Sequence, residues 1–282
     1  MRLSRRRFLT VSAAALCASP VSAEVDWQGT ALGAQAEIRL TGDRARAETA
    51  LQAARDALAR VERAFSLYRA HSELSRLNRT GQLRMSPTFA ALVARVPGLH
   101  RATDGLFDPS VGALWQAMLG GATGPVGWEK VSMAGLGLHL PGGMALTFNG
   151  IAQGFATDRV AATLQAHGFR DVVVDMGEVW VGDRERTIGL PGRTAIRLRS
   201  RALSTTAVDA LRINGHSHIL HPSKGRATWA EATVEAHDAT TADAVSTALT
   251  LASGTDLAAR MLENGLVTRV WLRAFDGKTF EV

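Results

Sequence analysis

An aspartate and a threonine in the last fifth of the chain are spaced to share one face of a helix. They are Asp243 and Thr247, within the string Thr241-Ala242-Asp243-Ala244-Val245-Ser246-Thr247. Residues four apart on a helix lie one turn apart on the same side. A carboxylate and a hydroxyl placed in this way suit a hard, oxygen-preferring cation such as Mg²⁺. The alternative is that Asp243 is an ordinary first-turn helix acid and Thr247 is a buried hydroxyl.

A glycine-containing turn, Asn149-Gly150-Ile151-Ala152-Gln153-Gly154, lies between an expected strand and an expected helix. Such a turn lets backbone groups approach a phosphate or a cation, and the N-terminus of the helix favours negative charge. The string is not G-x-G-x-x-G, and no Walker lysine follows it. The local spacing is therefore also compatible with a tight turn that binds nothing.

Three histidines, His216, His218 and His221, fall within six residues. On a strand, the first two face one side and the third faces the other. No carboxylate or thiol close by in the sequence completes a zinc site, so one histidine acting as an acid or base is favoured over a transition-metal site.

Two further segments carry residues suited to ligand binding. Tyr68 is the only tyrosine and follows an expected helix, where its ring can stack on a planar ligand or simply fill the core. A loop over residues 103–112 contains Leu106, Phe107 and Asp108 and leads into another expected helix.

Hydrophobic periodicity predicts the elements that position these residues. Helices and strands mix without regular β-α-β alternation, which favours an α+β or complex α/β fold over a doubly wound sheet. Helices are expected over residues 48–67, 86–103, 150–168 and 242–252. Strands are expected over residues 28–40, 144–148, 172–175, 184–190, 195–198, 210–213, 218–220, 233–236 and 267–273.

The first 23 residues have the pattern of an export signal. The string Ser4-Arg5-Arg6-Arg7-Phe8-Leu9 matches the twin-arginine signal and precedes a short apolar run and a small-residue cleavage site. We expect cleavage after Ala23, a periplasmic location and one domain over residues 24–282. An uncleaved membrane anchor, or a lipid on Cys17, remains an alternative.

The charge of the chain is concentrated in this signal. The 282 residues carry a formal charge of +6, which falls to +2 without Arg2, Arg5, Arg6 and Arg7. A nearly neutral domain gives no support to a nucleic-acid partner. No run of 18 apolar residues follows the signal, so no membrane span is expected in the mature chain.

Taken in order, these segments resemble the ApbE family, the bacterial FAD:protein FMN transferases. The resemblance extends from about residue 29 to residue 251. It implies a single flavin transferase domain of the α+β class, with mixed sheets and flanking helices. The matching motifs fall at residues 66–78, 105–114, 149–158, 202–206, 218–225 and 242–248.

The resemblance also implies a reaction. Asp243, Thr247 and the backbone carbonyl of Gly150 would bind Mg²⁺, and FAD would be the substrate. His218 would take the proton of an acceptor threonine as its hydroxyl attacks the FMN phosphorus and AMP leaves. The acceptor would be a flavoprotein of a membrane-bound or periplasmic electron-transfer system. The residues expected against FAD are Leu32, Tyr68, Leu106, Phe107, Asp108, Thr147, Gln153 and Leu220.

Three positions depart from the family pattern. Gln153 replaces a lysine, and Thr147 and His221 replace acids. The strings at residues 149–154 and 175–178 are similar to a subgroup linked to maturation of nitrous-oxide respiration proteins. Two alternatives stay open, namely an FAD pyrophosphatase that yields FMN and AMP and a non-catalytic periplasmic FAD-binding protein.

Overall fold

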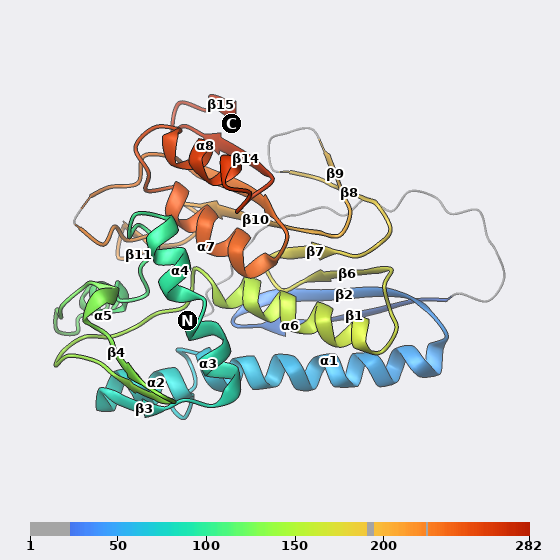
Figure 1. The fold of residues 1–282 in the computed structure, drawn as a ribbon, viewed down its shortest axis with the longest axis horizontal. Helices are drawn as coiled ribbons and strands as arrows, with labels where there is room; N and C mark the ends of the chain where they lie inside the picture. The colour runs from blue at the N-terminus through green and yellow to red at the C-terminus, as the bar shows by residue number, and fades with distance from the viewer. Residues whose placement is uncertain (1–22, 191–194, 224) are drawn as a thin grey trace.

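An eight-stranded sheet forms the centre of the computed structural model (Figure 1), which describes residues 23–190, 195–223 and 225–282. The strand order is β1-β2-β6-β7-β10-β13-β14-β15, and all neighbours pair antiparallel. Residues 1–22 of the expected twin-arginine signal lie outside the described residues, and Ala23, its last residue, begins β1. The strands are β1 (Ala23–Ala31), β2 (Ala34–Gly42), β6 (Val172–Asp175), β7 (Val179–Val181), β10 (Arg201–Ala207), β13 (Glu231–Ala236), β14 (Arg269–Arg273) and β15 (Thr279–Glu281).

Smaller sheets and helices surround this sheet. Among the described residues, none of the helices is both long enough and apolar enough to cross a membrane. The minor strands are β3 (Gln82–Arg84), β4 (Ser132–Ala134), β5 (Gly137–His139), β8 (Arg186–Ile188), β9 (Ile196–Leu198), β11 (Arg212–Ile213) and β12 (His216–Ser217). The helices are α1 (Arg44–Phe65), α2 (Glu73–Thr80), α3 (Pro87–Val93), α4 (Val96–Ala102), α5 (Gly112–Met118), α6 (Ala152–Ala166), α7 (Ala239–Leu249) and α8 (Asp256–Glu263), with a 3-10 turn at Trp128–Lys130.

Both faces of the large sheet are covered. Helices α1, α6 and α7 lie along one face (Figure 1), where Val234 packs with Val245 and Leu249 of α7. On the other face, Ile188 and Leu198 of the β8–β9 hairpin pack in one cluster with strand residues. Because side chains alternate along a strand, burial on both faces produces continuous apolar runs such as β6.

The predicted α+β class is confirmed, and four of the expected elements are wrong in form. The single strand over residues 28–40 is a hairpin, since Leu32 and Gly33 turn the chain with φ of 49° and 86°. The helix over residues 86–103 is two helices, because Pro97 has no N–H to donate to the carbonyl of Val93.

The other two differences concern short strands beside the site. Residues 144–148 form no regular strand, and Ala145 makes only an isolated parallel bridge with Val111. Residues 218–220 form no strand, because β12 ends before them at Ser217. The helices over residues 48–67, 150–168 and 242–252 are confirmed as α1, α6 and α7, with shifted ends.

Helices α6 and α7 approach each other most closely at Gly154. A Cβ atom at this position would overlap the backbone carbonyl oxygen of Ala239 and lie 2.9 Å from Cβ of Asp243. Only glycine fits such an approach without displacing a backbone. The contact therefore sets the first turn of α6 directly against the segment of α7 that carries Asp243.

Gly154→Ala should destabilise the fold by about 1–3 kcal/mol, because the added methyl group must push the two helices apart. The matched control is Gly98→Ala in α4, where a Cβ would meet nothing within 4 Å. That control should be neutral or up to about 1 kcal/mol stabilising, since alanine is the better helix former. Urea unfolding measures both, and a Gly154→Ala protein as stable as the original would contradict the close contact.

Candidate metal and nucleotide site

A small cavity gathers most of the residues predicted to act on FAD. Its volume is about 60 Å³, which suits an ion with a few waters, because a cavity needs about 10–15 Å³ to hold one water. Trp115 and Thr206 also line the cavity, although neither was predicted. The predicted residues that line it are Leu106, Phe107, Asp108, Thr147, Gly150, Gln153, His218, Leu220, Asp243 and Thr247.

The three predicted metal ligands come together from two elements. A Cβ on Gly150 would lie 2.9 Å from Oγ1 of Thr247, so the turn before α6 touches the middle of α7. Asp243 is 3% exposed, and its Oδ2 accepts a hydrogen bond of 3.0 Å from the backbone N–H of Gly154. Positive potential at the N-terminus of α6 favours a carboxylate there. One carboxylate, one hydroxyl and one backbone carbonyl form a donor set that hard cations prefer.

A row of hydroxyls connects Thr247 with strand β10. Oγ1 of Thr206 lies 3.4 Å from Oγ1 of Thr247 and 2.8 Å from Oγ of Ser246. Ser246 also contacts Ser204, with 2.9 Å between their hydroxyl oxygens, and donates to the carbonyl of Asp243 at 3.0 Å. The hydroxyls satisfy one another in the interior, which fixes α7 against the sheet at the level of the cavity.

Aromatic packing on both sides fixes the turn that contains Gly150. Phe148 precedes the turn and Phe155 follows it, and both rings contact Phe65 of α1 at centroid distances of 5.1 and 6.0 Å. Phe89 of α3 stacks on Phe65 at 4.8 Å. Buried aromatic pairs of this kind have specific geometries, so the turn is held by side chains that point away from the cavity.

His218 enters the cavity from the segment after β12. Its Nδ1 lies 3.0 Å from the backbone carbonyl of Leu211. A carbonyl only accepts hydrogen bonds, so Nδ1 carries the proton and the lone pair of the neutral ring is on Nε2. Trp115 donates from its indole nitrogen to the carbonyl of His218 at 3.1 Å and fixes the backbone of this residue. The arrangement holds the ring in the tautomer that a base requires.

Comparisons with known proteins identify the family of this chain. The ApbE family profile matches residues 32–269. The chain belongs to the ApbE family. No curated protein matches the chain in sequence.

Solved structures of ApbE proteins share the fold. Flavin transferase ApbE from Vibrio cholerae is similar with a TM-score of 0.77 and 21% identity, over 92% of this chain and 97% of that chain. Pseudomonas stutzeri flavinyl transferase ApbE, in its apo form, gives 0.80 and 22%, over 94% and 97%. The apbe protein of Thermotoga maritima gives 0.79 and 23%, over 92% and 97%. The family resemblance drawn from the motifs is thereby confirmed.

Asp108, expected against FAD in the ApbE reading, is engaged within its own loop. Its Oδ1 accepts from the backbone N–H and the hydroxyl of Ser110, at 2.8 and 2.6 Å, and its Oδ2 accepts from the N–H of Trp128 at 3.0 Å. These bonds join the loop before α5 to the 3-10 turn that begins at Trp128. The carboxylate is 6% exposed and shapes the cavity wall, while its predicted contact with FAD stays a prediction.

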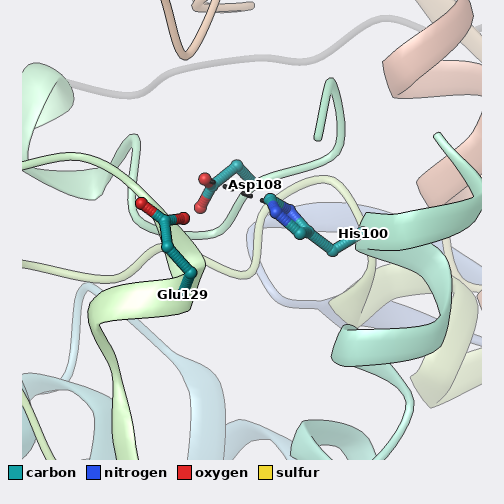
Figure 2. Close-up of side chains that lie close together, drawn as sticks. All are labelled: His100, Asp108 and Glu129. Atoms are coloured by element: carbon teal, nitrogen blue, oxygen red, sulfur yellow. Dashed lines mark ion pairs between the residues drawn. The ribbon is translucent and has the colours of Figure 1, made fainter. Parts of the chain in front are cut away.

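His100, Asp108 and Glu129 lie within reach of a single metal ion (Figure 2). Within the described parts of the chain, this is the one group of three such side chains, and His216, His218 and His221 form none. However, Nδ1 of His100 is 2.9 Å from the carbonyl of Phe107 and therefore carries a proton. His100 and Asp108 are therefore engaged by backbone groups of the loop and of the 3-10 turn.

Gln153, which stands where the family has a lysine, contacts the turn over residues 175–178. Its Nε2 donates to the carbonyl of Met176 at 3.4 Å, and a Cβ at Gly177 would overlap this amide. Thr157, one turn further along α6, donates to the carbonyl of Glu178 at 2.9 Å. Gln153 therefore packs against Gly177, whose φ is 105°, in the facing turn.

Leu32 and Tyr68 lie outside the cavity, next to each other at the β1–β2 turn. A Cβ on Gly33 would be 3.5 Å from the ring of Tyr68, and that ring is 66% exposed. Glu62 of α1 joins the two segments, because its carboxylate accepts from the N–H of Leu32 at 3.3 Å and from Arg69 at 2.5 Å. An exposed aromatic ring is suited to stacking on a planar ligand.

Asp158 is an acid of α6 that the sequence analysis did not single out. It accepts hydrogen bonds from the backbone N–H groups of Ala239 and Thr240, at 2.8 and 2.9 Å, and from the hydroxyl of Thr240. Burial raises the pKa of Asp158 to about 6, against the opposing hydrogen bond from Thr240, and the charge of Asp238 raises it further. The sequence could have pointed to Asp158, because this residue lies four positions after Gly154 and therefore on the same face of the helix.

The stability of the protein should therefore depend on the charge of Asp158. Because its pKa is higher in the folded chain than the ordinary value of 3.8, folding favours the protonated form. That contribution is fully present below about pH 4 and is lost as pH rises through about 6. The difference in unfolding free energy between the original protein and Asp158→Asn should change over this interval, as measured by urea unfolding at several pH values. A difference independent of pH would contradict the raised pKa.

Proposed function

We propose that this chain transfers FMN from FAD to a threonine hydroxyl of an acceptor flavoprotein and releases AMP, with Mg²⁺ as the required ion. The structural relatives from Vibrio cholerae and Pseudomonas stutzeri are a flavin transferase and a flavinyl transferase, which supports the transfer of a flavin group. The oxygen donors in the cavity support the choice of magnesium, and the threonine acceptor and AMP follow from the resemblance to the ApbE family.

The observation that carries the proposal is the meeting of Gly150, Asp243 and Thr247 in the cavity that also contains His218. Oxygen donors for a hard cation lie beside a histidine whose basic nitrogen is Nε2. A pyrophosphate has the chemistry to use both, because its charge must be neutralised and its attacker must lose a proton. Bound Mg²⁺ would neutralise the pyrophosphate and polarise its phosphorus–oxygen bonds.

The residues of the chain then have distinct tasks. Gly150, Asp243 and Thr247 would hold the ion, and the backbone N–H groups at the start of α6 would favour the phosphate charge. His218 would take the proton from the acceptor hydroxyl at Nε2 as the threonine oxygen bonds to the FMN phosphorus. The bond from that phosphorus to the bridging oxygen breaks, and AMP leaves with that oxygen. The isoalloxazine ring would lie outside the small cavity, on the side of Tyr68.

The acceptor is proposed to be a flavoprotein of a membrane-bound or periplasmic electron-transfer system. The twin-arginine string at residues 4–9 supports a periplasmic location. This signal directs proteins for export in folded form, so the chain would meet its acceptor after the central sheet and the cavity have formed.

The decisive experiment mixes residues 24–282 with FAD, Mg²⁺ and an acceptor that carries the target threonine. We expect a fluorescent acceptor band on a denaturing gel and an equal amount of AMP, both abolished by chelator. AMP and free FMN without a labelled band would instead indicate an FAD pyrophosphatase. Bound FAD without either product would indicate an FAD-binding protein.

Asp243→Ala should lower AMP release by about 100-fold or more, since a lost metal contact removes several kcal/mol of transition-state stabilisation. The matched control is Asp256→Ala, which removes an exposed first-turn acid from α8. AMP release at saturating Mg²⁺ measures both variants. Normal turnover in Asp243→Ala would refute the metal site.

His218→Ala should slow transfer by about 10²–10⁴-fold, the usual contribution of a general base, and leave the dissociation constant of FAD little changed. His216→Ala serves as the control, because that side chain is exposed two residues earlier. Single-turnover transfer and FAD titration separate the two effects. A loss confined to FAD affinity would show that His218 binds FAD and is not the base.

A further inference from the structure

Two acids from different parts of the chain hold the N-terminus of α7. Asp238 is the N-cap of the helix and accepts from the N–H of Thr241 at 2.8 Å. Arg95, the residue before α4, donates to the same carboxylate at 3.1 Å and to the hydroxyl of Thr241 at 2.8 Å. Asp158, on α6, is the second acid, and it accepts from the first two N–H groups of α7, at Ala239 and Thr240.

The two acids differ in what they attach α7 to. Asp238 belongs to the segment of α7 itself, so its bond to Thr241 completes the helix without reference to α6. Asp158 and Gly154 are four residues apart on one face of α6, and both touch the first turn of α7. The helices are therefore in contact at both Gly154 and Asp158. Two separate contacts determine the distance between the helices and also the position of α7 along α6.

That register decides where the oxygen donors lie. Asp243 is one turn beyond Ala239, and its carboxylate meets the N–H of Gly154 at 3.0 Å. Thr247 is one further turn along and lies beside Gly150. A shift of α7 along α6 would separate both donors from the turn at Gly150 together. The contact at Asp158 is on the opposite side of Gly154 from that turn, so it controls the shift from a distance.

We propose that Asp158 is a positioning residue that fixes α7 on α6 and thereby aligns Asp243 and Thr247 with the turn at Gly150. Asp158 is not among the residues that line the cavity, and its three hydrogen bonds go to Ala239 and Thr240. The proposal rests on the proposed function only in naming the cation, because the alignment of the two helices is a property of the chain alone.

The test compares Asp158→Ala with Asp238→Ala, which removes a cap from the same helix end but leaves the bonds between α6 and α7 in place. The first readout is amide hydrogen exchange at Gly154, followed by NMR, with the amide of Val234 in the central strand β13 as the reference for global unfolding. The second is binding of Mn²⁺ alone, followed by its paramagnetic resonance signal. Neither readout requires FAD or an acceptor.

In Asp158→Ala, the amide of Gly154 should exchange about tenfold faster relative to Val234, a loss typical of one hydrogen bond. Mn²⁺ should bind about 10- to 100-fold more weakly, as is usual when support for a metal ligand is removed. Asp238→Ala should leave both values within about threefold of the original protein, although the helix loses a cap.

Equal effects of the two variants on Gly154 would overturn the proposal, since Asp158 would then be one more helix cap. Unchanged exchange at Gly154 in Asp158→Ala would overturn it as well. If Mn²⁺ does not bind the original protein, the proposed metal site fails, but the exchange comparison still decides the role of Asp158. Should Asp158→Ala not fold, Thr240→Val removes one of the three bonds with little change in shape, and the same ordering of effects is expected.

Discussion

The bond from the backbone N–H of Gly154 to the carboxylate of Asp243 joins the two helices on which the site depends. It exists because α6 has a glycine where α7 comes closest, so that the first turn of one helix and an acid of the other can meet. A side chain at that position would separate the helices by more than a hydrogen bond can span. The position of the oxygen donors of α7 beside the turn at Gly150 depends on this close approach.

Burial makes the approach demanding, because polar groups inside a protein must find partners. The interior around α7 contains hydroxyls of β10 and two buried or half-buried acids, Asp243 and Asp158, that accept from backbone N–H groups at helix starts. Such groups are stabilised only in the folded arrangement, so they make the register of the helices specific. The apolar packing around Phe65 stabilises the same arrangement without selecting where an oxygen atom lies.

Gln153, one of the three positions that differ from the family pattern, has a defined partner in the structure. It faces the turn at Gly177 and donates to the carbonyl of Met176, so it joins α6 to the loop after β6. A longer lysine side chain would need a different partner at this position. Thr147 and His221, the other two positions, have no part in this contact.

Sequence alone determined the chemistry available to this chain and the helices that carry it. The ordered motifs, which include the i, i+4 spacing of Asp243 and Thr247 and the glycines around Gln153, were sufficient to identify the family. Hydrophobic periodicity was sufficient to predict α1, α6 and α7. These are local patterns, and local backbone geometry gives them their meaning. Hydrophobic periodicity did not predict the turn at Leu32–Gly33 or the break between α3 and α4 at Pro97, because each depends on one or two residues rather than on a repeated pattern.

Only the tertiary structure decided which of these residues meet. Asp158 lies about eighty positions before its partners at Ala239 and Thr240, and Trp115 about a hundred before His218. No period in the sequence reports such contacts, because they depend on the order of strands in the sheet and on how closely two helices pack. The same packing engaged Asp108 within its own loop and placed Leu32 and Tyr68 outside the cavity. The spacing of residues along the chain identified the oxygen donors, and the close packing of α6 against α7 brings them together into one site.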